Sequence, residues 1–351
     1  MSNFNNILTS FSINSDSTVA PLGNGLINST FLVTAPDNKR YVMQRINTNI
    51  FPNVDVLQDN IVRVTSHIRK KLLSNGTSDI DRKCLRFLYN TTTSKTYYHD
   101  GQDYWRIMVY IPDSFTHDAV TPVHAEAAGL AFGQFETMLS DMNPLPAEII
   151  PNFHNMEFRL TQLNQAITEN RANRLDNIKS LVKDILKLRD IACTAERLQR
   201  DGKLPLRVCH CDTKVNNVLF DKDGNTLCVI DLDTVMPGNI LSDYGDFMRT
   251  AGNRAPEDEP DLTKVQINTE VYEAFTKGYL EGTAEFLTET ERRLLPHGLF
   301  RFAYMQAIRF LSDYINGDTY YKINYPEHNL IRAQAQWQLA QRALDQLPQT
   351  I

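Results

Sequence analysis

HCDTKVNN, residues 210–217, runs directly into VLFDKDGNTLCVIDLD, residues 218–233. Val208, just before the loop, and residues 218–220, just after it, are β-branched or large apolar types that suit a half-buried strand. The sequence therefore predicts two strands joined by a short polar loop that carries a histidine, an aspartate and an asparagine.

A hairpin is predicted directly after this loop. Asp223-Gly224 is a strong two-residue turn signal, so residues 218–220 are expected to pair antiparallel with residues 226–231. This pairing places the end of the loop, at Asn217, near Asp231 across the hairpin.

The residue types in this region suit phosphoryl transfer. An amide oxygen from Asn217 and a carboxylate from Asp231 are hard oxygen ligands of the kind that Mg²⁺ binds. Asp212 is then free to accept a proton from an attacking hydroxyl group. A positioned nucleophile, metal-held phosphates and charge neutralisation are the components that this reaction needs.

The spacing His210-x-Asp212-x₄-Asn217 resembles the catalytic loop of the kinase superfamily, with Asp231 in the place of its metal-binding aspartate. The resemblance implies that Asp212 is the catalytic base and that Lys214 faces the transferred phosphoryl group. It also implies ATP as phosphoryl donor and Mg²⁺ held by Asn217 and Asp231. The alternative is a solvated loop with a structural aspartate.

The first third of the chain is predicted to form a sheet and one helix. Strand-like runs flank a predicted turn at Asp37-Asn38, and apolar residues spaced by three or four predict a helix over residues 54–73. Residues 84–90 and 104–111 are predicted to be further strands.

Several residues in this part are expected to contact ATP. Gly23-Asn24-Gly25 looks like a short phosphate-covering loop, and Arg45 stands where the phosphate-binding lysine is normally found. The other readings are a plain turn and an exposed strand arginine. Asp59, on the predicted helix, is the candidate acidic partner of Arg45, and Ile111 is expected to contact the nucleotide.

Downstream of about residue 122 the pattern is mainly helical. The predicted fold class is α+β, bilobal and protein-kinase-like, with a small sheet-rich N-terminal lobe and a larger, mainly helical C-terminal lobe. We expect a nucleotide-binding lobe over residues 1–110, a hinge over residues 111–118 and a catalytic and substrate-binding lobe over residues 119–351.

The segment from the end of the hairpin onward indicates which branch of the kinase superfamily the chain resembles; it reads VIDLDTVMPGNILSDYGDFMR, residues 229–249. Protein kinases match less well, because Leu-Asp and not Phe-Gly follows Asp231. The segment is similar to the aminoglycoside phosphotransferase and choline kinase family, in which a short loop leads to a second aspartate-containing turn. Asp243 and Asp246 stand in that turn, and Asp246 is expected to brace the catalytic loop.

Four segments between residues 210 and 322 resemble bacterial N-acetylhexosamine 1-kinases: HCDTKVNN, IDLDTVMPG, SDYGDFMRTAGN and AIRFLSDYINGDTYYK. This resemblance implies phosphorylation of the anomeric hydroxyl of N-acetylglucosamine or N-acetylgalactosamine. It implies contacts with the small-molecule sugar substrate from Asp212, Arg309 and Tyr320. A surface arginine and a packing tyrosine are the alternatives for Arg309 and Tyr320.

Four questions stay open at this point. Asp233 is either a metal or substrate contact or an exposed hairpin residue, and the acidic run PEDEPD, residues 256–261, is either a cation-attracting or a solvated loop. The acceptor is alternatively an aminoglycoside or choline. A nucleotide-binding pseudokinase that serves as an interaction module is the remaining reading.

Composition and the pattern of apolar segments argue against several classes of protein. The formal net charge of −6 predicts no general attraction to nucleic acid or to anionic membranes. No run approaches a membrane span and no secretory signal begins the sequence, so a cytoplasmic protein is expected. The 5 cysteines have no regular spacing, which favours buried free thiols over a disulfide framework.

Overall fold

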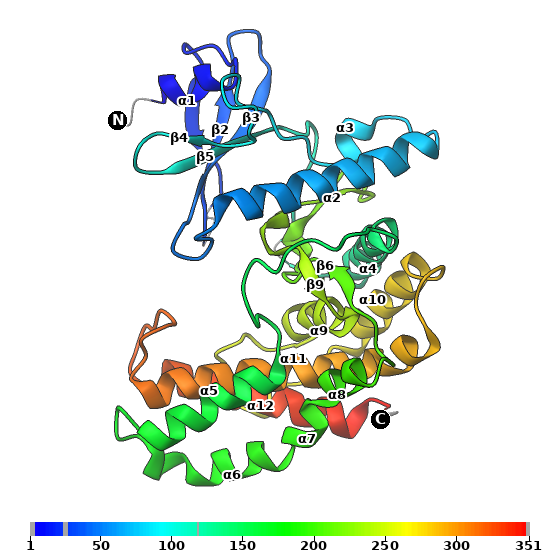
Figure 1. Ribbon diagram of the computed structural model, residues 1–351. Helices are drawn as coiled ribbons and strands as arrows, with labels where there is room; N and C mark the ends of the chain where they lie inside the picture. Colours follow the sequence, from blue (N-terminus) through cyan, green and yellow to red (C-terminus); the bar gives the residue numbers. More distant parts are fainter. Residues whose placement is uncertain (1–3, 24–26, 118, 349–351) are drawn as a thin grey trace. The chain divides into compact units, whose positions relative to one another are not determined.

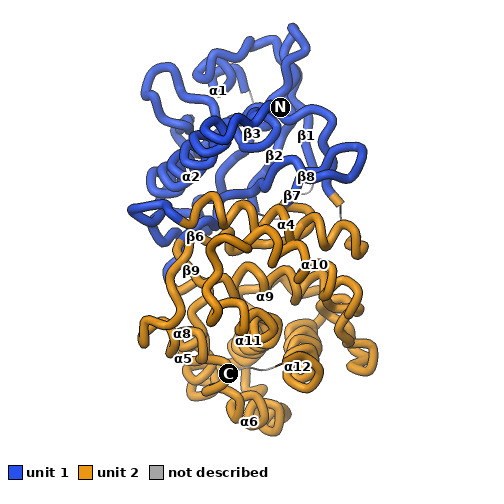
Figure 2. The backbone as a smooth tube through the Cα atoms, turned by 90° about the vertical axis from the view of Figure 1, so that its right-hand side faces the viewer, with its two compact units in different colours: residues 1–116, 141–151, 218–236 blue, residues 117–140, 152–217, 237–351 orange. Residues whose placement is uncertain are grey.

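The computed structural model describes residues 4–23, 27–117 and 119–348 (Figure 1). The chain divides into two compact units, coloured separately in Figure 2. Unit 1 comprises Met1–Thr116, Asp141–Pro151 and Val218–Met236, and unit 2 comprises His117–Ser140, Asn152–Asn217 and Pro237–Ile351.

Unit 1 contains a five-stranded antiparallel sheet in the order β1-β2-β3-β5-β4. Its strands are β1 (Thr18–Pro21), β2 (Ser29–Thr34), β3 (Arg40–Ile46), β4 (Tyr98–His99) and β5 (Tyr104–Val109). The turn predicted at Asp37-Asn38 joins β2 to β3, and Asn38 has the positive φ of 63° that such a tight turn requires. The strand expected over residues 84–90 is reduced to a single bridge between Phe87 and Met108.

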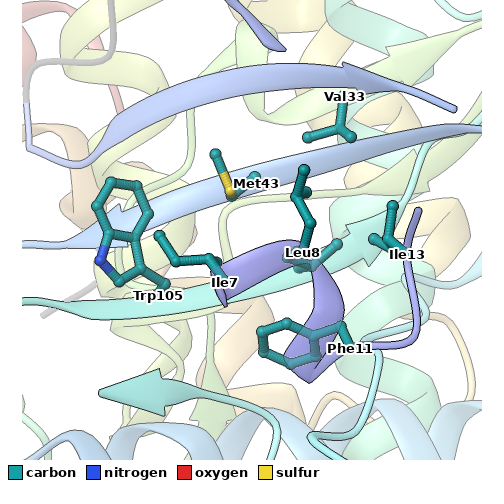
Figure 3. Packing of buried hydrophobic residues seen from close by; sticks show 8 residues of the cluster. Ile7, Leu8, Phe11, Ile13, Val33, Met43 and Trp105 are labelled. Atoms are coloured by element: carbon teal, nitrogen blue, oxygen red, sulfur yellow. The ribbon is translucent and has the colours of Figure 1, made fainter. Parts of the chain in front are cut away.

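One face of this sheet packs on the short helix α1 (Asn5–Ser10), as Figure 3 shows. Ile7 and Leu8 from the helix meet Met43 and Trp105 from β3 and β5, and all four are buried. Because side chains alternate across a strand, residues next to Met43 and Trp105 in the sequence point to the other face.

The remaining elements of unit 1 are helical or form the predicted hairpin. The helix α2 (Val54–Ser74) begins at Asn53, whose side chain accepts the Val56 N–H, and its apolar stripe is buried. The other elements are α3 (Ile80–Lys83), β7 (Val218–Phe220), β8 (Thr226–Val229) and the 3₁₀ turn η3 (Leu232–Thr234). β7 pairs antiparallel with β8, as predicted.

Unit 2 is mainly helical. Its helices are α4 (Pro122–Leu139), α5 (Met156–Glu169), η1 (Leu175–Ile178), α6 (Lys179–Lys187), α7 (Arg189–Ala192), α8 (Thr194–Arg200), η2 (Val215–Asn217), α9 (Ile240–Ala251), α10 (Thr269–Gly282), α11 (Glu289–Asn316) and α12 (His328–Gln346). The strands β6 (Arg207–Cys209) and β9 (Met236–Gly238) form a two-stranded sheet. The helix α11 begins with a capping box formed by Thr288 and Glu291, and it ends at Gly317 with a φ of 95°.

Glycines allow two pairs of helices in unit 2 to approach closely. A Cβ on Gly129 of α4 would lie 2.4 Å from the carbonyl oxygen of Phe275 in α10. A Cβ on Gly245 of α9 would lie 2.3 Å from the carbonyl oxygen of Gly298 in α11. No larger residue fits at these crossings without moving backbone, so the positions of α4 and α9 are fixed by their neighbours.

The predicted α+β fold, with a sheet-containing N-terminal region and a helical C-terminal part, is confirmed. The turn expected to carry Asp243 and Asp246 is instead part of the helix α9. Across the described ranges, no helix has both the length and the apolar character that crossing a bilayer requires.

Candidate active site

The loop between β6 and β7 brings three of the predicted site residues together. Lys214 Nζ lies 2.7 and 2.9 Å from the two carboxylate oxygens of Asp212. Asn217 Nδ2 donates to the backbone carbonyl of Asp212 at 2.7 Å and to its carboxylate at 3.3 Å. The Asp212 side chain is 21% exposed, so this carboxylate is partly desolvated yet accessible.

The backbone of this loop is held by Asp243 from α9. Its carboxylate accepts the backbone N–H of His210 at 2.6 Å and that of Cys211 at 2.7 Å, and its carbonyl accepts the Thr213 hydroxyl at 2.6 Å. Cys211 has a φ of 63°, uncommon for a residue with a side chain, and these bonds stabilise that conformation. Asp243 therefore provides the bracing that the sequence led us to expect from Asp246.

A second carboxyl group supports Asp243 from α4. Glu136 is buried, hydrogen-bonds to Asp243 and accepts the Tyr279 hydroxyl at 2.5 Å. Burial, together with the charge of Asp243, raises the pKa of Glu136 well above its ordinary value of 4.5. Burial raises the pKa of Asp243 as well, so a proton shared between the two carboxyl groups avoids burying two negative charges.

Asp246 lies one helical turn beyond Asp243 and interacts with Arg249, whose Nη2 lies 3.2 Å from its carboxylate. Burial raises the pKa of Asp246 to about 6, an effect that Arg249 opposes and that the charge of Asp212 reinforces. Its carboxylate thus contributes to the electrostatic environment of Asp212 without bracing the loop.

In unit 1, the hairpin register pairs Val218 with Val229. Asp231 follows Val229 by two residues and is exposed, with a φ of 59° and a ψ of 59°. A left-handed backbone at a residue with a side chain costs energy, and such conformations cluster at functional sites.

Asp233 is buried, and both of its carboxylate oxygens accept hydrogen bonds from side chains. Arg106 Nη1 lies 2.5 Å from one oxygen and Asn28 Nδ2 lies 2.6 Å from the other. All three residues are less than a tenth exposed. Arg106 also donates to Gln44 at 2.9 Å, and Asn28 accepts the Asn47 N–H at 2.9 Å. This buried network was missed in the sequence, where its one signal is a lone arginine inside the apolar strand YWRIMV.

Arg45 lies on the opposite face of the sheet from this network. It is paired in register with Trp105, whereas Gln44 is paired with Arg106. Its guanidinium, 48% exposed, reaches Asp103 at 3.4 Å and Ser29 at 3.3 Å. The acidic partner is therefore Asp103 and not Asp59, which lies 3.9 Å from Arg63.

Of the other nucleotide contacts predicted in unit 1, Gly23 has a φ of 69°, as a turn glycine does, and Ile111 is buried. Asn24 and Gly25 lie outside the described residues.

The two predicted substrate residues of unit 2 belong to one aromatic cluster. Arg309 of α11 donates to Gln306 at 2.7 Å, and its guanidinium carbon lies 5.6 Å from the ring centre of Tyr321. The ring of Tyr320 meets that of Tyr321 edge-on at 4.8 Å, and Tyr320 is 73% exposed. Arg309 and Tyr320 are thus linked through Tyr321, which the sequence-based prediction did not include.

Residues 18–293 match the phosphotransferase enzyme family (APH), so the chain belongs to this family. Similar solved structures share the fold at low sequence identity. An aminoglycoside phosphotransferase from Alicyclobacillus acidocaldarius is 13% identical with a TM-score of 0.61, over 95% of this chain and 92% of that chain.

Two other similar solved structures are named as kinases of other compounds. Plasmodium vivax ethanolamine kinase is 15% identical with a TM-score of 0.53, over 91% of this chain and 82% of that chain. The amicoumacin kinase hAmiN, in complex with AMP-PNP, Ca²⁺ and Ami, is 12% identical with a TM-score of 0.56, over 92% of this chain and 88% of that chain. The phosphotransferase family expected from the 229–249 segment is confirmed.

Proposed function

We propose that this phosphotransferase moves the γ-phosphoryl group of ATP to the anomeric hydroxyl of an N-acetylhexosamine. The observation that supports this proposal most directly is the cluster of Asp212, Lys214 and Asn217 in the loop between β6 and β7. A partly buried carboxylate beside an ammonium group is suited to accept a proton while negative charge develops on a neighbouring phosphoryl group.

In the proposed reaction, Asp212 accepts the proton of the sugar hydroxyl as its oxygen attacks the γ-phosphorus. The new bond joins that oxygen to phosphorus, the bond to the bridging oxygen of ADP breaks, and ADP leaves with the electron pair. Lys214 faces the transferred group and neutralises part of its charge. Asp243 keeps the loop in place through the N–H groups of His210 and Cys211.

The predicted metal ligands present suitable atoms. Asn217 turns its Nδ2 toward Asp212, so its amide oxygen is directed away from that carboxylate. That oxygen and the exposed carboxylate of Asp231 are the hard ligands that Mg²⁺ accepts, with water and phosphate oxygens completing the shell. When bound, the cation would neutralise phosphate charge. ATP is further expected to contact Gly23, Asn24, Gly25, Arg45 and Ile111.

The proposed division of labour follows the chain. Residues 1–110 bind the nucleotide, residues 111–118 serve as a hinge, and residues 119–351 carry the catalytic base and bind the acceptor. Arg309 donates to the sugar and Tyr320 offers it an exposed aromatic surface.

Charge in unit 2 favours a neutral acceptor over an aminoglycoside, choline or ethanolamine. Arg159 adds a second guanidinium near Arg309, and burial together with the Arg309 charge lowers the pKa of Arg159 to about 10. A cationic acceptor at Arg309 would be repelled by both.

The acidic run, residues 256–261, is expected to attract a cationic acceptor only weakly. Glu257 accepts a bond from Arg249 at 2.8 Å, Asp258 contacts His328 at 3.1 Å, and Glu259 lies 3.4 Å from Lys264. These carboxylates already have partners within the chain, which reduces their attraction for a ligand.

The test is phosphorus NMR of the purified protein with ATP and Mg²⁺, in separate tubes with N-acetylglucosamine, N-acetylgalactosamine, choline or kanamycin. An anomeric phosphate signal that depends on the sugar is expected, and none with the Asp212→Asn variant. Signal only with choline or kanamycin would overturn the sugar assignment. ATP binding without turnover of any acceptor would favour the pseudokinase reading.

A further inference from the structure

The segment after α11 is tied to one buried carboxylate, that of Asp313. One of its oxygens accepts the backbone N–H of Thr319 at 2.9 Å and that of Tyr320 at 2.9 Å. The other accepts the backbone N–H of Tyr321 at 2.9 Å and the side-chain amide of Asn329 at 2.9 Å. Three consecutive backbone donors therefore converge on a single side chain.

The chain must turn sharply to make these bonds. α11 ends at Gly317, with a φ of 95°, and Asp318 also has a positive φ, of 61°. Two left-handed residues in succession reverse the chain so that the N–H groups of residues 319–321 point back at α11. Asp318 is held in turn by Arg174, at 2.5 Å, and by Asn329, at 2.9 Å.

Asp313 is 5% exposed, and no lysine or arginine forms an ion pair with it among the described residues. Its charge is balanced by the N–H dipoles that it orders. A buried carboxylate satisfied in this way stabilises one backbone conformation strongly, because every alternative leaves it without donors.

The ordered backbone presents an exposed ring. Tyr320 is fixed by its N–H yet is 73% exposed, whereas the ring of Tyr321 packs at 4.6 Å on Phe310 and near Arg309. Asp313, which is buried, therefore fixes the backbone that carries the exposed ring of Tyr320.

We propose that Asp313 is a positioning residue for acceptor binding, which fixes residues 319–321 so that Tyr320 and Arg309 form one binding surface. This inference rests on the proposed function, because it takes Tyr320 and Arg309 as the residues that contact the sugar. Asp313 does not touch the acceptor; it lowers the cost of binding by ordering the loop beforehand.

The test uses Asp313→Asn in the full-length protein, because the amide nitrogen cannot accept an N–H as the carboxylate oxygen does. Asp345→Asn, an exposed change on α12, is the matched control. Backbone hydrogen exchange at residues 319–321 should accelerate at least about tenfold in Asp313→Asn alone. The sugar KM should rise at least about tenfold, with the ATP KM and acceptor-independent ATP hydrolysis within about twofold of the wild type.

Unchanged exchange at residues 319–321, or faster exchange with an unchanged sugar KM, would overturn the role of Asp313. Absence of sugar turnover by the wild-type protein would instead contradict the proposed function. Should Asp313→Asn fail to fold, Arg174→Gln loosens the same loop through Asp318, and a smaller rise in sugar KM is expected. An unchanged sugar KM in that variant, with the loop loosened, would also count against the inference.

Discussion

Asn217 donates one side-chain amide group to two oxygens of Asp212, the backbone carbonyl at 2.7 Å and the carboxylate at 3.3 Å. This bond fixes the position of the carboxylate and also sets which way the Asn217 oxygen points. The proposed base and a proposed metal ligand are therefore coupled through one side chain, and substitutions at the two positions should have different kinetic consequences.

Replacing Asp212 by asparagine removes the proton acceptor but keeps the shape of the side chain. Turnover should fall by about 10²- to 10⁴-fold, the usual contribution of general-base catalysis. ATP affinity, measured by calorimetry, should change little. Asp223→Asn, an exposed change in the hairpin turn, is the control, and an unaltered turnover in Asp212→Asn would remove Asp212 as the base.

Asn216 and Asn217 offer a matched pair, since the first is exposed and the second is buried against Asp212. Asn217→Ala should raise the Mg²⁺ concentration needed for half-maximal turnover by at least about tenfold, or about 1.4 kcal/mol. Asn216→Ala should leave it unchanged. Equal Mg²⁺ requirements in the two variants would show that Asn217 is not a metal ligand.

Glu136 should make stability depend on pH. Its pKa is raised in the folded protein, so folding is most favoured by this group below the ordinary pKa of 4.5 and loses that contribution as the pH rises toward the folded-state value. Glutamine resembles a protonated glutamate and does not titrate.

The wild-type Tm should therefore fall more steeply than that of Glu136→Gln as the pH rises above about 5. Thermal unfolding at several pH values measures both slopes, and parallel slopes would mean that Glu136 is not held protonated. Tyr279→Phe, which removes a hydroxyl donor to the same carboxylate, should raise the pKa of Glu136 further and extend the fall in Tm to higher pH.

Arg106 and Arg45 are adjacent in the sheet but on opposite faces, which makes them a matched pair for stability. Arg106→Ala leaves Asp233 buried without its cation and should lower the free energy of unfolding by about 3–5 kcal/mol. Arg45→Ala removes an exposed pair and should cost less than about 1 kcal/mol. Urea unfolding distinguishes them, and equal losses would contradict the assignment of Asp233 to a buried network. The ATP KM of Arg45→Ala tests its predicted contact with phosphate.

Local patterns in the sequence were sufficient for the central hairpin. Asp223-Gly224 and the apolar runs beside it specify the turn and the pairing of Val218 with Val229 without any distant contact. The spacing of Asp212 and Asn217 similarly predicted a loop that the structure closes by direct bonds.

Two features were beyond local patterns. The register of β3 decides whether the side chain of Gln44 or that of Arg45 lies on the same face of the sheet as Asp233. That register depends on pairing with β5, a strand some 60 residues later in the chain. The choice of Asp243 over Asp246 as the brace depends on the rotation of α9, and the close crossing at Gly245 fixes that helix.

The contact of Gly245 with Gly298 also joins two parts of unit 2. α9 carries Asp243, which holds the backbone before Asp212, and α11 carries Asp313, which holds residues 319–321. Because the two helices meet backbone to backbone, the spacing between these two anchors is set by the main chain and not by exchangeable side chains. Under the proposed acceptor site, sequence variation within residues 319–322 would change the acceptor while the geometry of the Asp212 loop stays the same, so this loop would be the place to engineer a new specificity.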